Sequence, residues 1–289
     1  MINLTISITG PETPDEKFNL IRKNIKNLDN PENDEISLSF IGLRIFTAEK
    51  ICILLSDLPS RLTTINLSSH FLGGREINCI QLALSGLHHS PQVNTLILKN
   101  NRLGTFGRRD PENTFSNLSP TIMTLDISSN EYDLRSTFYI SQLLSGLKHT
   151  SVKKLIMRHN GLGKRNFKEL LEAFKDLPIN ELDISNNDFK LNAHELIELF
   201  DSLAYLDCIH FSGNNLEKLS EIEQATLIAY LKNKNNILIN EEPYFSEILK
   251  KKKIYLTHSI DRFFYTSTKE TAYFAEPNVI GLTNKFMSI

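Results

Sequence analysis

Three side chains in the second half of the chain have the types and spacing that nucleophilic catalysis uses. Cys208 and His210 lie two residues apart in a segment with the pattern of a β-strand, so their side chains share one face. In the preceding copy of that segment, Asp183 occupies the place that His210 occupies in this one. Neighbouring strands lie about 4.8 Å apart. A thiol, an imidazole and a carboxylate placed in this way could act as nucleophile, base and orienting group.

The same three residues can also be ordinary polar side chains on a sheet. Nothing in the sequence indicates an oxyanion hole or an enclosed pocket beside them, and an open sheet excludes water poorly. The chain also contains no phosphate-binding loop, HExxH motif or nucleophile elbow. We therefore interpret the arrangement as coincidental and predict a protein that is not an enzyme and has no catalytic residue.

Histidines and cysteines could also bind a metal. His88, His89 and His149 each come shortly after a Gly-Leu dipeptide, but the polar ends of helices explain them equally well. The three cysteines are far apart and odd in number, whereas zinc sites and disulfide frameworks need close pairs. We predict no metal site and no cofactor, and we expect a reducing compartment. The cysteines are Cys52, Cys79 and Cys208.

The segments that position these side chains are copies of one phrase, L-x-L-x-x-N-x-L, in which other apolar residues replace some leucines. The spacings between the first residues of successive copies are 31, 29, 30, 27 and 27. A phrase repeated at this period is the signature of a leucine-rich repeat. The copies begin at Ile65, Leu96, Leu125, Leu155, Leu182 and Ile209.

Each part of the phrase has a physical role. The two apolar residues of L-x-L share one face of a strand, and stacked strands bury that face in a continuous core. The sixth residue is usually Asn, whose amide can donate to and accept from the backbone of a buried turn. His70 departs from this pattern, which puts the bonding of its turn in question. The sixth residues are His70, Asn101, Asn130, Asn160, Asn187 and Asn214.

An amphipathic helical pattern follows nearly every strand, which predicts an α/β leucine-rich repeat solenoid of about eight or nine repeats. We expect a horseshoe with parallel strands on its concave face and helices on its convex face. One repeat has room only for a short helix that begins at Asp110-Pro111, after an Arg108-Arg109 pair that is either a solvated loop tip or a partner contact.

We divide the chain into three parts. Residues 1–35 form an N-terminal cap of one strand and one helix, and the helix begins with a capping box of Thr13 and Glu16. Residues 36–240 form the repeats. Residues 241–289 contain no repeat phrase but many aromatic residues, which argues against disorder. We expect part of this last segment to be helical and to cover the final repeat.

The candidate binding surface is the concave face, because the residues that flank the two core positions of each strand point into it. Its central part combines positive and negative charges with two isoleucines, which suits a protein partner. For any single residue, a solvated strand position is the simpler explanation. The predicted contact residues are Ile97, Lys99, Asp126, Lys154, Ile156, Arg158, Glu181, Asp183 and His210.

Composition restricts the class of partner. The formal net charge of the 289 residues is −2, so the charge balance does not indicate nucleic acid or an anionic membrane as the partner. Residues 1–10 alternate apolar and polar side chains, unlike a signal peptide. No apolar run has the length of a membrane span. We expect a monomer.

The period and the helix in each repeat resemble the ribonuclease-inhibitor type of leucine-rich repeat. Segments such as LPINELDISNNDFKLNAHELIELFDSL are similar to repeats in effectors of intracellular bacterial pathogens that a type IV system secretes. The resemblance implies a protein that is secreted without a cleavable signal peptide and binds a host protein in the host cytosol; otherwise it is cytoplasmic. The alternative is a ubiquitin-ligase adaptor or an enzyme whose active part follows Asn240.

Overall fold

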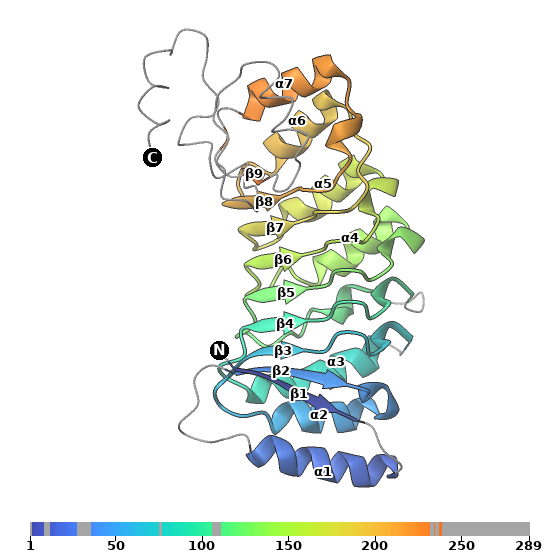
Figure 1. Cartoon of the computed structure of the whole chain (residues 1–289), viewed down its shortest axis with the longest axis vertical. Coiled ribbons are helices and arrows are strands. Elements are labelled where there is room, and N and C mark those ends of the chain that lie inside the picture. The colour runs from blue at the N-terminus through green and yellow to red at the C-terminus, as the bar shows by residue number, and fades with distance from the viewer. Residues whose placement is uncertain are drawn as a thin grey trace, which may run out of the picture. The chain divides into compact units, whose positions relative to one another are not determined.

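The computed structural model of the chain describes residues 2–8, 12–27, 36–74, 77–105, 111–231, 234 and 237–238. The predicted Arg108-Arg109 loop and the segment 241–289 lie outside these residues, and so does the alternative active part after Asn240. The chain divides into two compact units, Met1–Glu181 and Leu182–Ile289. Both contain the same alternation of strand, turn and helix (Figure 1).

The first unit contains strands that pair in parallel and in chain order from β1 to β6. These strands are β1 (Ile2–Ser7), β2 (Ile36–Ile41), β3 (Leu62–Asn66), β4 (Thr95–Ile97), β5 (Thr124–Asp126) and β6 (Lys154–Ile156). Its helices are α1 (Pro14–Asn27), α2 (Ala48–Ser56), α3 (Ile77–Ser85), α4 (Thr137–Ser145) and α5 (Phe167–Lys175). Short 3-10 turns are η1 (Leu43–Ile45), η2 (Leu72–Gly74), η3 (Gly86–His89), η4 (Leu103–Thr105), η5 (Pro111–Thr114), η6 (Tyr132–Leu134) and η7 (Leu162–Lys164).

The second unit continues the same pattern. Strand β7 (Glu181–Asp183) spans the division between the units, and β8 pairs in parallel with β9. The remaining elements are α6 (Ala193–Ser202), β8 (Cys208–His210), η8 (Leu216–Lys218), α7 (Glu221–Leu231) and β9 (Ile237–Leu238).

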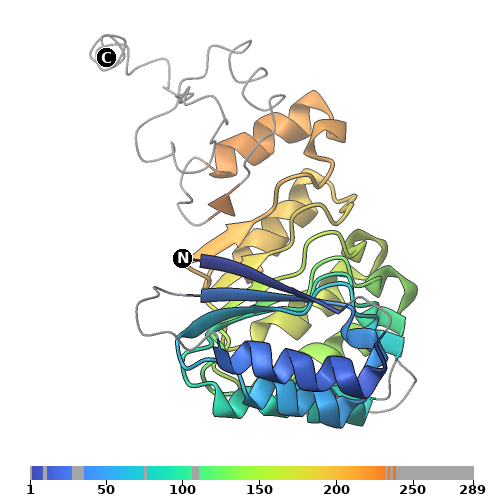
Figure 2. The same cartoon turned by 60° about the horizontal axis from the view of Figure 1, so that its bottom comes forward.

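The core of each unit lies between the strands and the helices. The central residues of β4, β5 and β6, which are Leu96, Leu125 and Leu155, are fully buried, while the residues on either side are half-buried. Figure 2 shows α1 and α2 on one side of the sheet in the first unit. We call the opposite side, which carries the half-buried residues, the strand face. The alternation that L-x-L predicts is therefore confirmed.

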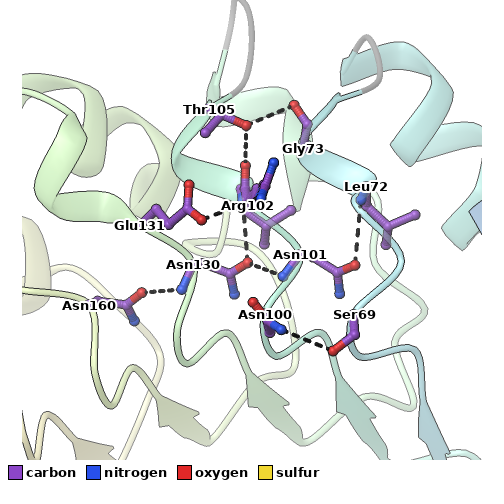
Figure 3. Close-up of polar contacts among 11 residues, drawn as sticks. Ser69, Leu72, Gly73, Asn100, Asn101, Arg102, Thr105, Asn130, Glu131 and Asn160 are labelled. Atoms are coloured by element: carbon purple, nitrogen blue, oxygen red, sulfur yellow. Dashed lines mark hydrogen bonds and ion pairs between the residues drawn. The ribbon is translucent and has the colours of Figure 1, made fainter.

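The asparagines form a hydrogen-bonded ladder through the turns (Figure 3). The Asn130 Oδ1 atom accepts hydrogen bonds from the backbone N–H groups of Asn101, at 2.8 Å, and Leu103, at 3.2 Å. Its Nδ2 group donates to the carbonyls of Leu98, at 3.0 Å, and Ser128, at 3.1 Å. One fully buried side chain thus satisfies four backbone groups in two neighbouring turns.

The same bonding recurs along the chain. Asn101 accepts from the N–H of His70 at 2.8 Å, so the turn of His70 receives its bond although His70 itself replaces the asparagine. Asn160 accepts from the N–H of Asn130 at 2.6 Å. In the second unit, Asn214 accepts from the N–H of Asn187 at 2.7 Å. The predicted role of the sixth residue is confirmed in both units.

The ladder holds the turns in an uncommon backbone conformation. Ser129 and Glu131, on either side of Asn130, have left-handed φ angles of 55° and 62°. The residues at the same two places in the other turns also have positive φ, and most are not glycine. Each residue other than glycine that adopts this conformation destabilises the fold by on the order of 1–3 kcal/mol. Neighbouring turns also approach one another closely. A Cβ atom on Gly104 would therefore lie only 2.3 Å from the carbonyl oxygen of Glu131.

Asn130→Ala should lower the free energy of unfolding by about 3 kcal/mol, because it leaves buried N–H groups without an acceptor. Equilibrium urea denaturation would measure the change. The matched control is Asn117→Ala, at an exposed position outside the ladder, which should change stability by less than about 0.5 kcal/mol. Equal stability of the two variants would contradict the ladder's role.

Candidate protein-binding surface

Three strands of the first unit bring one row of predicted contact residues together. The register pairs Ile97 with Asp126 and Asp126 with Ile156. All three side chains lie on the strand face and are half-buried. An acidic residue is therefore flanked on both sides by isoleucines, at the strand spacing of about 4.8 Å.

A basic row lies just beyond the ends of β4 and β6. Lys99 and Arg158 follow Ile97 and Ile156 by two residues, and both are exposed. The buried Ser128 lies between them, and its Oγ atom accepts a hydrogen bond from the Arg158 N–H group at 3.1 Å. Because the two cationic residues are two strands apart, their backbones are separated by roughly 10 Å. This spacing suits an acidic group that lies across the sheet.

Besides Asp126 and the basic row, this surface carries an ion pair. Lys154 Nζ lies 2.5 Å from Glu181 Oε1, and both side chains are partly exposed. Such a pair contributes on the order of 0–1 kcal/mol to stability. Its charges largely cancel for an approaching partner. Lys99 and Arg158 are the exposed cationic side chains of the surface.

The aspartates have a structural role that the sequence analysis missed. The Oδ1 atom of Asp126 accepts a hydrogen bond from the Ser128 N–H group at 2.9 Å. Asn66 accepts in the same way from Ser68 at 3.0 Å. This Asx-turn closes the end of the strand. An Asn or Asp followed two residues later by Ser, at the same place in several repeats, is the sequence signal that would have revealed it.

Asp183 follows the same rule in the second unit. Its Oδ1 atom accepts from the Ser185 N–H group at 3.1 Å, and only 1% of the residue is exposed. We predicted Asp183 as a contact residue, but its burial leaves almost no surface for a partner. The remaining site residues are at least partly accessible, and their role in binding stays a prediction.

Cys208 and His210 share the strand face of β8, as their spacing predicts. The Cys208 Sγ atom lies 3.4 Å from His210 Nε2, and both residues are half-buried. The carboxylate that would complete a catalytic group, Asp183, is buried and bonded to its own turn. The geometry thus places thiol and imidazole together without giving the carboxylate a specific orienting role.

The other candidate ligands lie on the surface. His88, His89 and His149 are exposed, and His88 Nδ1 lies 3.0 Å from the Ser85 carbonyl oxygen. In the part of the chain that the structure describes, these histidines belong to no group of three metal-ligating side chains. Among the described helices, none combines the length and the hydropathy that a membrane crossing needs.

Parallel strands, an asparagine ladder and a helix in nearly every repeat define the leucine-rich repeat fold. This chain is a leucine-rich repeat protein of the α/β solenoid class, a fold that commonly serves as a protein-binding scaffold.

Comparison with solved structures supports this assignment. The leucine-rich repeat-containing protein LegL7 from Legionella pneumophila matches with a TM-score of 0.69 and 21% identity, over 91% of this chain and 80% of that chain. A chain of the Rad7 and Elc1 complex from yeast matches with a TM-score of 0.40 and 14% identity, over 88% of this chain and 77% of that chain, which is too weak to support a conclusion. No family model and no curated protein matches the sequence.

Substitutions at Asp126 separate its charge from its hydrogen bond. Asp126→Asn keeps the acceptor, as Asn66 does in an earlier repeat, and should change stability by less than about 0.5 kcal/mol. Asp126→Ala removes the acceptor and should cost about 1 kcal/mol. Urea denaturation of both variants would measure these effects. If the two variants lost stability equally, the carboxylate charge would matter more than the Asx-turn.

Proposed function

We propose that this protein is a non-enzymatic interaction module whose strand face binds another protein. The observation that carries the proposal is the arrangement of two rows on neighbouring strands of the first unit. One row presents Ile97 and Ile156 as apolar contacts, and the other presents Lys99 and Arg158 as cations. Apolar side chains give a partner contact area, while charges at the edge select it and speed its approach.

The backbone bonding of the face favours recognition over catalysis. The half-buried Asp126 side chain accepts a hydrogen bond from the backbone N–H group of Ser128. Side chains held in this way give a partner a fixed surface and lose little entropy when it binds. The charge distribution further indicates a partner that places an acidic group over Lys99 and Arg158 and apolar side chains over the isoleucines.

The double variant Lys99→Glu with Arg158→Glu should reduce capture of the partner about tenfold or more, because the acidic group would then meet like charges. The measurement is a pull-down from host-cell lysate with quantitative mass spectrometry, followed by an affinity measurement with the partner that it identifies. Both positions are exposed, so the unfolding midpoint should change little.

The matched control is Lys168→Glu with Lys175→Glu, which makes the same change of charge at exposed positions of α5. This control should capture the partner as the unaltered protein does. Undiminished capture by the strand-face variant would contradict the proposal, and so would an equal loss in the control.

The proposed setting is the cytosol of a host cell, where the protein acts as a monomeric effector delivered by a bacterial type IV secretion system. The resemblance of the repeats to those of effectors from intracellular pathogens supports this setting. The odd number of well-separated cysteines fits a reducing compartment. The same binding surface would also serve a protein that stays in the bacterial cytoplasm.

Delivery can be tested separately from binding. A reporter enzyme whose activity requires a cytosolic host factor would be fused to the chain and expressed in a bacterium that infects host cells. We expect reporter activity in the host cell only when the type IV system is intact. Equal activity with a disabled system, or none with an intact one, would exclude the effector setting and leave the binding proposal unaffected.

A further inference from the structure

Helix α7 of the second unit has two apolar faces. One face packs into the core through Gln224, Leu227, Ile228 and Leu231, all of which are buried. The other face is exposed and forms a shallow hollow lined by Glu221, Ile222, Ala225, Thr226 and Ala229. These residues follow the i, i+3, i+4, i+7 spacing of one helix surface. Ile222 is 81% exposed.

This exposed face differs from those of the two preceding helices, α5 and α6, whereas α4 also exposes an apolar side chain, Phe138. The exposed residues of α6 are His194, Glu198 and Asp201, and those of α5 are Lys168, Glu169, Glu172 and Lys175. The exposed face of α7 carries one carboxylate, at Glu221 in its first turn, and is otherwise uncharged. A helix that is apolar on opposite sides is typical of one that is covered on both. The apolar outer face of α7 is therefore available to a second packing partner.

The direction of the chain identifies that partner. On its core side, α7 packs against α6, where the Tyr230 hydroxyl donates a hydrogen bond to Asp201 at 2.7 Å and the Tyr230 ring stacks on Phe200 with centroids 6.4 Å apart. After α7 the chain enters β9, which pairs with β8. The order β7, β8, β9 shows that the chain advances by one repeat here. Strand β9 thus ends, at Leu238, at the position from which the next layer of the stack would be built.

The length and composition of the segment after Leu238 fit the exposed face. Residues 239–289 number 51 and include nine phenylalanine and tyrosine residues. A helix of the size seen in these repeats needs only about ten residues. Aromatic side chains bury large areas and fill shallow apolar hollows well.

We propose that the outer face of α7 is the docking site of the chain's own residues 239–289. An aromatic-bearing part of this segment packs over Ile222, Ala225, Thr226 and Ala229. A second copy of the chain is the competing occupant. The inference concerns a different surface from the proposed partner-binding face and holds or fails independently of it.

Photo-crosslinking in the full chain tests the proposal directly. The photoreactive residue p-benzoylphenylalanine would replace Ile222 in one sample and, as a control, the 63% exposed Leu134 of the first unit in another. Mixing labelled and unlabelled protein distinguishes links within a chain from links between chains. We expect Ile222 to link to residues 239–289 of the same chain. Links between two chains, links to other elements, or no links at this position would overturn the proposal.

Charge at the interface gives a second test. Ile222→Glu with Ala229→Glu should speed amide hydrogen exchange in peptides from 239–289 by about tenfold or more, because burial of a large aliphatic side chain is lost. Leu134→Glu with Phe138→Glu, also at exposed apolar positions, should leave those peptides unchanged. Exchange in α6 would report whether the variant still folds. Unchanged exchange in 239–289 of the α7 variant would count against the docking site.

Discussion

The structure depends on one constraint. Within each unit, the described turns that follow the strands stack on one another, and their buried backbone groups must be satisfied by the next turn. Asn130 meets this constraint for the turn of Asn101, and Asn160 meets it for the turn of Asn130. The ladder also maintains pairs of residues with left-handed φ that few side chains tolerate. Loss of one ladder asparagine would destabilise two turns at once. The ladder therefore explains why the repeat phrase contains Asn at its sixth position and why substitutions there should be costly.

This constraint explains why the strand face can vary. Core positions such as Leu125 are fully buried, and the ladder positions that bond the turns are Asn. The strand positions that flank the core residues are subject to neither requirement. The position directly before the first core residue holds Thr124, Lys154 and Glu181 in successive repeats. A solenoid can therefore change its partner by changing these positions without losing its fold.

The repeat phrase made the fold predictable, because its period fixes the strand, the turn and the helix together. The exposure of single site residues was less predictable. Asp126 and Asp183 occupy the same place in the phrase and make the same Asx-turn, yet the first is half-buried and the second is almost fully buried. Burial of such a residue depends on the side chains of the adjacent repeats, which the sequence pattern of a single repeat does not describe. The outer face of α7 was likewise not anticipated, because residues 221–231 have an ordinary helical pattern and only the structure shows which side is left exposed.

The same contacts bear on binding and catalysis. A nucleophile needs a base that is free to take its proton, an orienting group and a water-poor site. On β8 the thiol of Cys208 and the imidazole of His210 lie together, but the carboxylate of Asp183 is committed to a backbone turn. Side chains that maintain the scaffold in this way cannot also change protonation or position during a reaction without loosening the turn. Half-buried side chains such as Asp126 can, however, present fixed contacts to a partner, and this is the physical basis of the recognition proposed for the strand face.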